Sequence, residues 1–207
     1  MRCFPVALLP MRFLPDPILR QQARKINPIP KNFQNYIDNM IETMHEEQGV
    51  GLAANQVGSL RKVAVIQLPD WEEAIVLINP EIIRREGERE VEEGCLSIPG
   101  YRGTVKRAER VRLRALDLNG KVIRIKAEGL LAQALEHETD HLNGYLYIDR
   151  LVSRETLWKV TYNPEGEAEY HRASSAAAPE SPEASEGPET SGEPSGPTEP
   201  GQPPNQS

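Results

Sequence analysis

Two histidines and an acid share one short segment, LEHETDHLNG at residues 135–144. His137 and His141 are four residues apart, and in an α-helix such residues lie on nearly the same face, one turn apart. Both imidazoles could therefore bind one metal ion. Glu138 is rotated from His137 by roughly 100° around the helix, so it could reach a water on that ion without binding the ion itself. This HExxH arrangement is typical of metal hydrolases.

The alternative interpretation is that two unrelated histidines happen to share a helix. The pattern has only three fixed positions, so it also occurs by chance in unrelated proteins. Here, however, the stripe that carries both histidines is otherwise apolar, with Leu130 and Ala134 on the same face. Each buried imidazole would then need its own hydrogen-bonding partner. A metal site explains the pair better, but it requires a third ligand.

The third ligand is not evident downstream of the helix. No HxxGxxH extension follows His141, and Asp149 and Glu155 are only formal candidates. Upstream, Cys95 lies in the segment EGCLSIPG at residues 93–100. A lone cysteine is usually a small buried hydrophobe. Near two metal-facing histidines, its thiolate is instead a competent ligand.

A second segment, GVGLAANQVG at residues 49–58, is rich in small residues and holds the amide side chain of Gln56. By itself it indicates a tight turn after a helix. It is not a phosphate-binding loop, because it lacks the Lys-Ser/Thr pair that such a loop requires.

Three segments in this order resemble the signatures of the peptide deformylase family, which are a GxGxAAxQ loop, an EGCLS segment and a HExDH helix. Here they read GVGLAANQ at 49–56, EGCLS at 93–97 and HETDH at 137–141. The flanking segments PDPILRQQA, SIPGYRG and DHLNG match as well, and the resemblance covers roughly residues 6–155. One such motif would be weak evidence, whereas three in order are highly specific.

The resemblance implies an α+β fold in which antiparallel β-strands enclose a buried central helix that carries the HExDH motif. It implies a hydrolase that removes the formyl group from the N-terminal formyl-methionine of newly synthesised proteins and releases formate. The family binds one divalent metal, Fe²⁺ in its native state, for which Zn²⁺, Ni²⁺ or Co²⁺ can substitute. By similarity the metal ligands are Cys95, His137 and His141, with water in the fourth position.

The resemblance also implies catalytic and substrate-binding roles. Glu138 would accept the proton of the attacking water and deliver it to the leaving amine. The side-chain amide of Gln56 and the backbone N–H of Leu96 would stabilise the charge that develops on the formyl oxygen. Further residues would bind the extended peptide or form the methionine pocket: Val50, Gly51, Gly94, Arg102, Leu130, Gln133, Ala134 and His137.

Three positions near the expected site depart from the common family pattern. Glu136 stands where a Gln is usual, Gln133 stands where an Arg is common, and Asn55 replaces a frequent Pro. None of them is a metal-binding or proton-transfer position. The departures therefore bear on pocket preference and on the electrostatics of the site, and they leave the reaction type intact.

Local patterns predict the elements that must position these residues. Asp16 and Pro17 suit the start of a short helix within residues 15–26. Residues 33–48 show helical spacing of apolar side chains, with Gly49 as the expected stop. The remaining elements are an entering strand near the N-terminus, strands at 62–68, 74–82 and 89–98, a hairpin at 110–127 and a helix at 128–144 that ends before Gly144.

The hairpin at 110–127 has one irregularity. Its apolar residues alternate up to Ala115 and then change phase, which indicates either a bulge or a strand end near that residue. Asn119 and Gly120 are suited to the tight turn that joins its two strands.

Composition divides the chain near residue 163. Residues 163–207 contain nine of the 18 prolines, nine Glu and one Arg, but no Leu, Ile, Val, Phe, Met or Trp. Such a segment cannot bury enough apolar surface to offset its ordering entropy. We therefore expect a catalytic domain at residues 1–162 and a disordered acidic tail at 163–207. The net charge of −7 comes from this tail, so the domain itself is nearly neutral.

The same observations limit the expected partners. A nearly neutral domain gives no indication of a nucleic-acid site, and no apolar run is long enough to span a membrane. Two cysteines, Cys3 and Cys95, form no disulfide framework and favour a cytoplasmic protein. The expected partners are nascent formyl-methionyl polypeptides at the ribosome, bound by a monomer.

Two rival hypotheses remain open from the sequence. A zinc peptidase of the HExxH kind would use a downstream acidic or histidine ligand and would not depend on Cys95. A non-catalytic interaction protein would depend on its acidic tail and not on Glu138.

Overall fold

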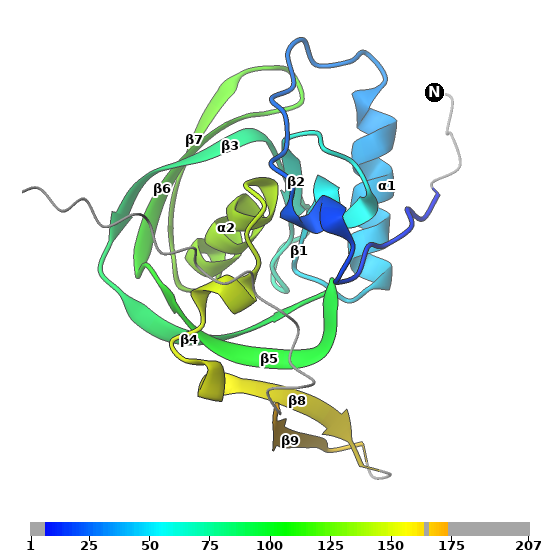
Figure 1. The fold of residues 1–207 in the computed structure, drawn as a ribbon. Coiled ribbons are helices and arrows are strands. Elements are labelled where there is room, and N and C mark those ends of the chain that lie inside the picture. Colours follow the sequence, from blue (N-terminus) through cyan, green and yellow to red (C-terminus); the bar gives the residue numbers. More distant parts are fainter. Residues whose placement is uncertain (1–6, 164–165, 174–207) are drawn as a thin grey trace, which may run out of the picture.

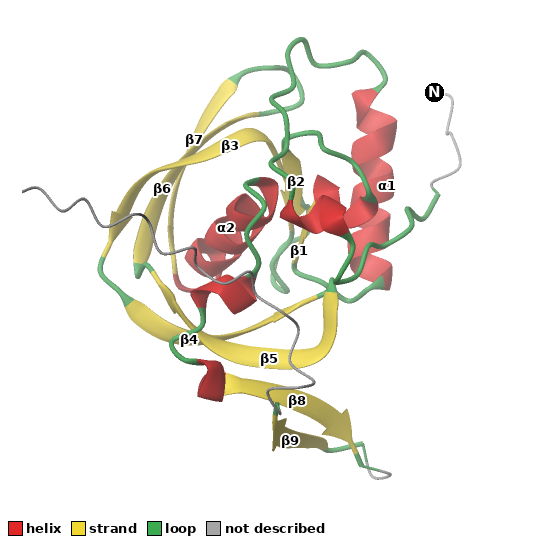
Figure 2. Ribbon diagram, viewed as in Figure 1, coloured by secondary structure: helices red, strands yellow, loops and turns green. Residues whose placement is uncertain are grey.

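The computed structural model describes residues 7–163 and 166–173, which form two antiparallel sheets wrapped around one central helix (Figures 1 and 2). The central helix is α2 (Gly129–Leu142). The five-stranded sheet has the order β1 (Gly51–Ala53), β2 (Val63–Ile66), β3 (Ile75–Glu86), β6 (Arg110–Leu116), β7 (Val122–Glu128). The four-stranded sheet has the order β4 (Arg89–Cys95), β5 (Ile98–Arg107), β8 (Leu157–Tyr162), β9 (Ala168–Arg172).

All pairings between neighbouring strands of these two sheets are antiparallel. This arrangement confirms the α+β class and the enclosed helix. In Figure 1, β3, β6 and β7 curve around one side of α2, while β4 and β5 pass along another side. No helix among the described residues is both long and apolar enough to cross a membrane.

Helix α2 is buried because its small and apolar side chains fit against the curved sheet. Ala132, Leu135 and Leu142 are fully buried, and Leu135 belongs to the core formed with β6 and β7. The helix ends as expected: Gly144 has φ +82°, and a Cβ at this position would lie 2.5 Å from the backbone oxygen of Arg20. Only glycine allows both this backbone conformation and this close approach.

Helix α1 (Phe33–Glu46) packs its apolar stripe against β1, β2 and β3, but it does not stop as expected. The left-handed residue after the helix is Gln48, with φ 55°, and not Gly49. Position 49 favours glycine because of close packing and not because of its backbone conformation: a Cβ there would lie 2.7 Å from Cδ1 of Leu96. The glycine brings the first expected site loop close to the second.

The phase change near Ala115 coincides with an irregularity on one edge of β6. The pairing with β7 runs evenly from Arg110↔Glu128 to Leu116↔Val122. The pairing with β3 shifts register between Glu81↔Arg114 and Ile78↔Leu116, and β6 ends at Leu116. In the turn only Gly120 has positive φ, at 77°. The side chain of Asp117 accepts hydrogen bonds from the backbone of Asn119 and of Lys121, and thereby fixes the turn.

The N-terminal segment differs from the prediction. Asp16 caps the short helix Pro17–Arg20 through the N–H of Ile18, as expected. Residues 7–14, however, form no strand. The N–H of Arg12 donates to the backbone oxygen of Gln56 at 2.7 Å, and the N–H of Leu14 donates to that of Ser97 at 3.0 Å. The segment thus connects the two site loops. Its N–H groups, which a strand would donate to a neighbouring strand, donate to these loops instead.

Four strands were not predicted from the sequence: β1, β5, β8 and β9. Strand β5 follows Cys95 and contains Pro99, Gly100 and Gly103, which weaken the alternation that predicts a strand. Strand β9 lies in the segment expected to be disordered, and that expectation is wrong for residues 168–172. All five residues of β9 are exposed, and the strand is held by its pairing with β8. Backbone hydrogen bonds to β8 therefore order this segment, although it buries no apolar side chain. Residues 174–207 lie outside the described part.

Candidate active site

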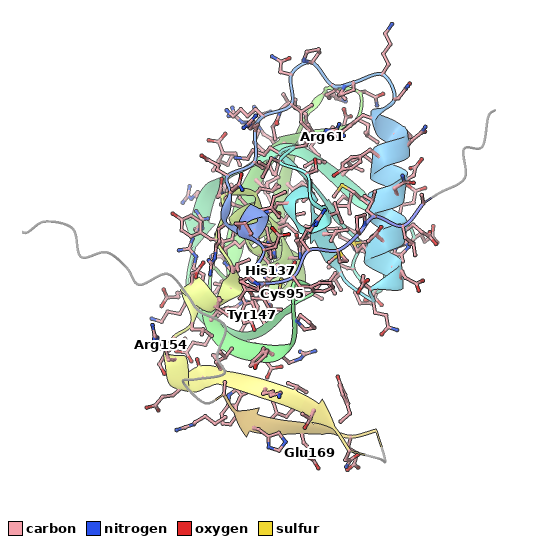
Figure 3. All side chains as sticks on the ribbon, turned by 45° about the vertical axis from the view of Figure 1, so that its right-hand side comes forward. Arg61, Cys95, His137, Tyr147, Arg154 and Glu169 are labelled. Carbon is pink, nitrogen blue, oxygen red and sulfur yellow. The ribbon has the colours of Figure 1, made fainter. Side chains whose placement is uncertain are left out.

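Three side chains with metal-ligating atoms converge at one end of the central helix. Nε2 of His141 lies 3.2 Å from Nε2 of His137 and 3.1 Å from Sγ of Cys95. The three ligand atoms all lie within 4.8 Å of one another, and Figure 3 shows Cys95 beside His137. Two imidazoles and a thiolate form a donor set that suits Zn²⁺ or Fe²⁺. The residues therefore fit one divalent cation.

Cys95 reaches this position through an irregularity between β4 and β5. The pairing runs evenly from Arg89↔Arg107 to Gly94↔Arg102 and then jumps to Cys95↔Ile98. Such a shift redirects a side chain at the end of a strand. The cysteine is thereby turned toward the helix, which its sequence position alone did not show.

The downstream ligands that a zinc peptidase would use are not in this cluster. The carboxylate of Asp149 is bonded to Arg20 and to the N–H of Leu146. Glu155 has an exposed side chain and lies 3.9 Å from Arg172. The geometry therefore favours Cys95 as the third ligand over either acid.

A buried charge network contacts His137 on the side of its ring away from the cluster. Its members are Arg107, Glu93, Asp140 and His137. Nδ1 of His137 lies 2.9 Å from Oε2 of Glu93, which leaves Nε2 directed at the cluster. Arg107 donates to both oxygens of Glu93, at 2.7 and 2.9 Å, and to Asp140 at 2.6 Å. A carboxylate on the second nitrogen of a ligating histidine fixes its tautomer and its orientation.

The network also fixes the charge states. Burial by itself would raise the pKa of Glu93, but hydrogen bonds from Arg107 and His137 outweigh it and lower the pKa to about 2. Burial would lower the pKa of Arg107, and the two acids reverse that effect and raise it. Burial and the neighbouring His137 lower the pKa of His141, which favours the neutral imidazole that a metal ligand requires.

Glu138 lies beside the cluster in an environment suited to proton transfer. It is 4 % exposed, and burial raises its pKa to about 7. Its Oε2 has no hydrogen-bond partner among the described residues. A Cβ on Gly51 would lie 2.3 Å from its Oε1, so the glycine is required for the carboxylate to occupy this position. A carboxyl with a pKa near neutrality can both accept and donate a proton.

Gln56 is fixed by its own turn of 3₁₀-helix, Ala54–Val57. Its Oε1 accepts from the N–H of Ala53 at 2.9 Å, so its Nε2 must point the other way. This nitrogen lies 3.2 Å from Oγ of Ser97 and 3.6 Å from Sγ of Cys95. An amide N–H is thus presented at the cluster by a side chain that is only 1 % exposed.

One cavity of about 490 Å³ contains nearly all of the expected site residues. Cys95, His137 and Glu138 lie in its wall, whereas His141 is buried behind it. The other expected residues that line the cavity are Val50, Gly51, Gln56, Gly94, Leu96, Arg102, Leu130, Gln133 and Ala134. The structure therefore brings together expected residues from three separate stretches of sequence.

The three unusual positions have distinct environments. Glu136 does not face the cavity: it is 5 % exposed and accepts from Nε of Arg85 at 2.7 Å and from the N–H of Ala108 at 2.8 Å. Gln133 lines the cavity and donates to the backbone oxygen of Glu92 at 3.0 Å. Asn55 donates to the backbone oxygen of His141 at 2.6 Å. Only Gln133 can contact a substrate directly.

Several residues of the site were missed from the sequence. Arg107 carried no signal, because its partners Glu93 and Asp140 are distant in the chain. Asp140 is part of the HETDH motif, but its pairing with Arg107 was not predicted. Tyr147 is 1 % exposed, and its ring centroid lies 6.5 Å from that of His137 (Figure 3). Tyr101, Val160 and Tyr162 extend the cavity wall. A deliberate search for strands after Cys95 and at the C-terminal end would have been needed to find these last three.

Known proteins share this sequence and this fold. The family model described as polypeptide deformylase matches residues 8–157. A peptide deformylase from Dehalococcoides mccartyi is 54% identical over 147 residues, which is 71% of this chain and 88% of that protein. A Legionella pneumophila peptide deformylase structure has a TM-score of 0.68 at 46% identity and covers 70% of this chain and 86% of that one.

A third comparison concerns a structure with a bound peptide. The class I type b peptide deformylase from Acinetobacter baumannii, bound to Met-Ala-Ser, has a TM-score of 0.67 at 34% identity and covers 71% of this chain and 100% of that one. The chain therefore belongs to the peptide deformylase family of metal-dependent hydrolases, which remove the N-terminal formyl group from nascent proteins.

Proposed function

We propose that Cys95, His137 and His141 bind the single catalytic metal of this enzyme and that Glu138, Gln56 and Leu96 carry out the reaction around it. The observation that carries the proposal is the convergence of the three ligand atoms within 4.8 Å beside a buried carboxylate. When bound, the cation supplies the acidity that makes water a nucleophile near neutral pH and positive charge beside the formyl oxygen.

Glu138 is the proton carrier. Its carboxylate accepts the proton of the attacking water and delivers it to the amine that leaves with the methionine. Its burial and its pKa of about 7 support both steps. The clash that a Cβ on Gly51 would cause shows how tightly the carboxylate is confined, and confinement keeps the proton transfer geometry fixed.

Gln56 and Leu96 stabilise the negative charge that develops on the formyl oxygen. The anchored Oε1 of Gln56 holds its Nε2 toward the cavity, so little reorganisation is needed as the charge grows. The backbone N–H of Leu96, directly after the metal ligand Cys95, is the second donor. Loss of one such donor typically costs about 10²–10³ in kcat.

The substrate peptide lies extended in the cavity. Val50, Gly51 and Gly94 provide backbone groups at its sides, and Arg102 lies toward its C-terminal end. The methionine side chain enters an apolar pocket formed by Leu130, Ala134 and neighbouring residues. A relative that binds Met-Ala-Ser supports the binding of a short peptide that begins with methionine.

The decisive test compares two neighbouring acids on α2. Formate release from a formyl-methionyl peptide is measured without oxygen and with Fe²⁺ present. We expect Glu138→Gln to keep the fold and the bound metal but to lose formate release, whereas Glu136→Gln, which faces away from the cavity, keeps it. Equal activity of the two variants would refute the assigned role of Glu138.

Cys95→Ser tests the third ligand. We expect it to lose tight metal binding, measured by competition with a chelator, because a hydroxyl is a poor replacement for a thiolate. Retention of tight binding would support the peptidase alternative, as would cleavage of internal peptide bonds without formate release.

Fe²⁺ is the proposed native metal. A ferrous ion held by a thiolate exposes both the metal and Cys95 to oxidation. We expect the Fe²⁺ enzyme to lose activity in air and to retain it under anaerobic conditions. Activity that stays constant for hours in air, with the Fe²⁺ content verified, would contradict this assignment.

We further infer that the enzyme works as a cytoplasmic monomer on nascent chains at the ribosome. We place its catalytic domain at residues 1–162, extended by strand β9, with the rest of the acidic tail dispensable for chemistry. Deletion of residues 174–207 should leave formate release unchanged. Sedimentation analysis, alone and with ribosomes, checks the oligomeric state and the association.

A further inference from the structure

The cavity extends beyond the part of the chain that matches the family model. That match ends at residue 157, yet Val160 and Tyr162 of β8 line the same cavity as Cys95, His137 and Glu138. The family match that includes the expected metal and catalytic residues does not reach these two side chains. The C-terminal hairpin β8–β9 therefore supplies a wall to the site from outside that match.

Strand β8 is held firmly against β5. The two strands pair from Tyr101↔Lys159 to Gly103↔Leu157. They remain close beyond that stretch, since a Cβ on Gly100 would lie 3.7 Å from the backbone oxygen of Val160. Leu157 is 3 % exposed and packs in the core cluster that contains Val105 and Tyr147. The strand that carries Tyr162 is thus anchored at its start in the core.

Strand β9 supports β8 from its other edge. The pairing is continuous from Trp158↔Arg172 to Tyr162↔Ala168, so β9 holds the backbone of Tyr162 on one side. Val160 lines the cavity and is 9 % exposed, whereas Tyr162 lines it and is 71 % exposed. The ring of Tyr162 is therefore presented to solvent at the rim of the cavity by a strand that is paired on both edges nearer its start.

A single exposed tyrosine is common on protein surfaces and needs no explanation by itself. Tyr170 provides the comparison within the same hairpin. It lies opposite Val160 on β9 and is 48 % exposed, but it does not line the cavity. The position of Tyr162 at the site, and not its exposure, distinguishes the two rings.

We propose that Tyr162, supported by Val160, binds the substrate peptide downstream of its formyl-methionine and favours an apolar side chain near the third residue. Strand β5 lies between β4, which ends at Cys95, and β8. Two strand spacings amount to about 10 Å, and Tyr162 lines the same cavity as Cys95 and His137. A peptide whose first residue lies at the metal therefore shares one continuous cavity with the ring, and we assign the ring to its third residue.

The chemistry of this outer wall indicates what it binds. Ile98, Tyr101, Val160 and Tyr162 give it an apolar and aromatic character, and Gly100 leaves room beside them. Arg102, the one cation of this wall, is bound to Glu92 at 3.1 Å. A tyrosine offers a large rigid surface to an apolar side chain at little entropic cost. An apolar residue therefore fits better than a charged one.

The test uses the full-length, metal-loaded enzyme and two substrates, formyl-Met-Ala and formyl-Met-Ala-Leu-Ser. We expect Tyr162→Ala to raise KM for the longer peptide about fivefold, equivalent to about 1 kcal/mol, with kcat unchanged. Both parameters should stay unchanged for formyl-Met-Ala, which ends before the wall. Tyr162→Phe should behave like the unaltered enzyme, and Tyr170→Ala is the matched control.

Three results would overturn the inference. They are an unchanged KM of Tyr162→Ala for the longer peptide, an equal rise for both peptides, and an equal effect of Tyr170→Ala. The inference rests on the proposed function, and the short peptide separates the two. If the unaltered enzyme released no formate even from formyl-Met-Ala, the proposed function would fail and this inference with it.

Discussion

The molecule uses the same charged residue types in two very different environments. In the buried charge network, the side chains of Arg107 and Glu93 are both 3 % exposed. On the outer face of the five-stranded sheet, Arg114 lies 2.7 Å from Glu81, at the same separation, but the two side chains are 52 % and 55 % exposed. The distances agree, and the surroundings differ.

This difference determines what each pair can do. Exposed pairs interact through water and contribute about 0–1 kcal/mol. A buried pair has lost its hydration, so removal of one partner leaves a charge that nothing compensates. The buried network therefore holds His137 in one orientation at the metal site, whereas the outer pairs mainly keep the surface charged. The following five predictions test this contrast.

Removal of Arg107 should give the largest effect. Arg107→Leu leaves Glu93 buried without its arginine, while Asp140 keeps Arg150 at 3.0 Å. We expect a loss of about 3–5 kcal/mol in the free energy of unfolding, most of it from the uncompensated charge of Glu93. Denaturant titration measures it. If the variant does not fold, Arg107→Lys, which keeps the charge but not the two-pronged hydrogen bonding, should show a smaller loss. A loss below about 1 kcal/mol in Arg107→Leu would contradict the proposed difference between buried and exposed ion pairs.

Acid should destabilise the protein through the same network. The pKa of Glu93 is lowered from 4.5 to about 2 in the fold. Its contribution is therefore fully present above pH 4.5 and is lost as the pH falls toward 2, and it amounts to about 3 kcal/mol. Urea unfolding of metal-free protein should show a weaker pH dependence in Glu93→Gln than in the unaltered chain. Identical pH profiles would argue against the assignment.

The metal site should weaken when Glu93 loses its charge. In Glu93→Gln the amide no longer fixes His137 as strongly, and we expect metal affinity to fall about 10–100-fold. Competition with a chelator measures this change. Glu92→Gln is the matched control, because Glu92 is the exposed neighbour and pairs with Arg102 instead. An equal fall in both variants would indicate a general effect of charge.

Glu136 should matter for stability and not for catalysis. Glu136→Gln weakens the hydrogen bonds from Arg85 and from the backbone of Ala108, and we expect a loss of about 1–2 kcal/mol. KM for formyl-methionyl peptides should stay constant, since the side chain does not face the cavity. A shift in KM without a change in unfolding would show that Glu136 acts on the pocket after all.

The exposed pair should give the smallest effect. Arg114→Gln removes the partner of Glu81, and we expect the smallest change in unfolding of the series, one that disappears in high salt. Unfolding measured at low and at high ionic strength checks it. A loss as large as that of Arg107→Leu would remove the distinction between the two regions.

Local sequence was sufficient for elements whose pattern is repeated and uninterrupted. The period of α2 and the alternation of β6 and β7 predicted these elements within a few residues. Strand β5 was missed because Pro99, Gly100 and Gly103 interrupt its pattern, and β9 because its residues bury nothing. Both strands are held by pairing with other strands, and such pairing cannot be predicted from the local sequence pattern.

The site shows the same division. The spacing of His137, Glu138 and His141 follows from helix geometry, so it was visible from the sequence alone. The environment of Glu136 was not, because its partner Arg85 is 51 positions away. Glu136 directly precedes the proposed ligand His137 but points away from the site, since successive helix residues are rotated by about 100°.

The sequence by itself predicted the proposed metal ligands and the family, through motifs whose residue types and order are specific. The tertiary structure alone decided that Arg107 holds Glu93 against His137 and that β8 brings Tyr162 to the rim of the cavity. The physical reason is the range of the interactions. Helix spacing is fixed by the local backbone, whereas buried ion pairs and neighbouring strands join residues that only the folded chain brings together.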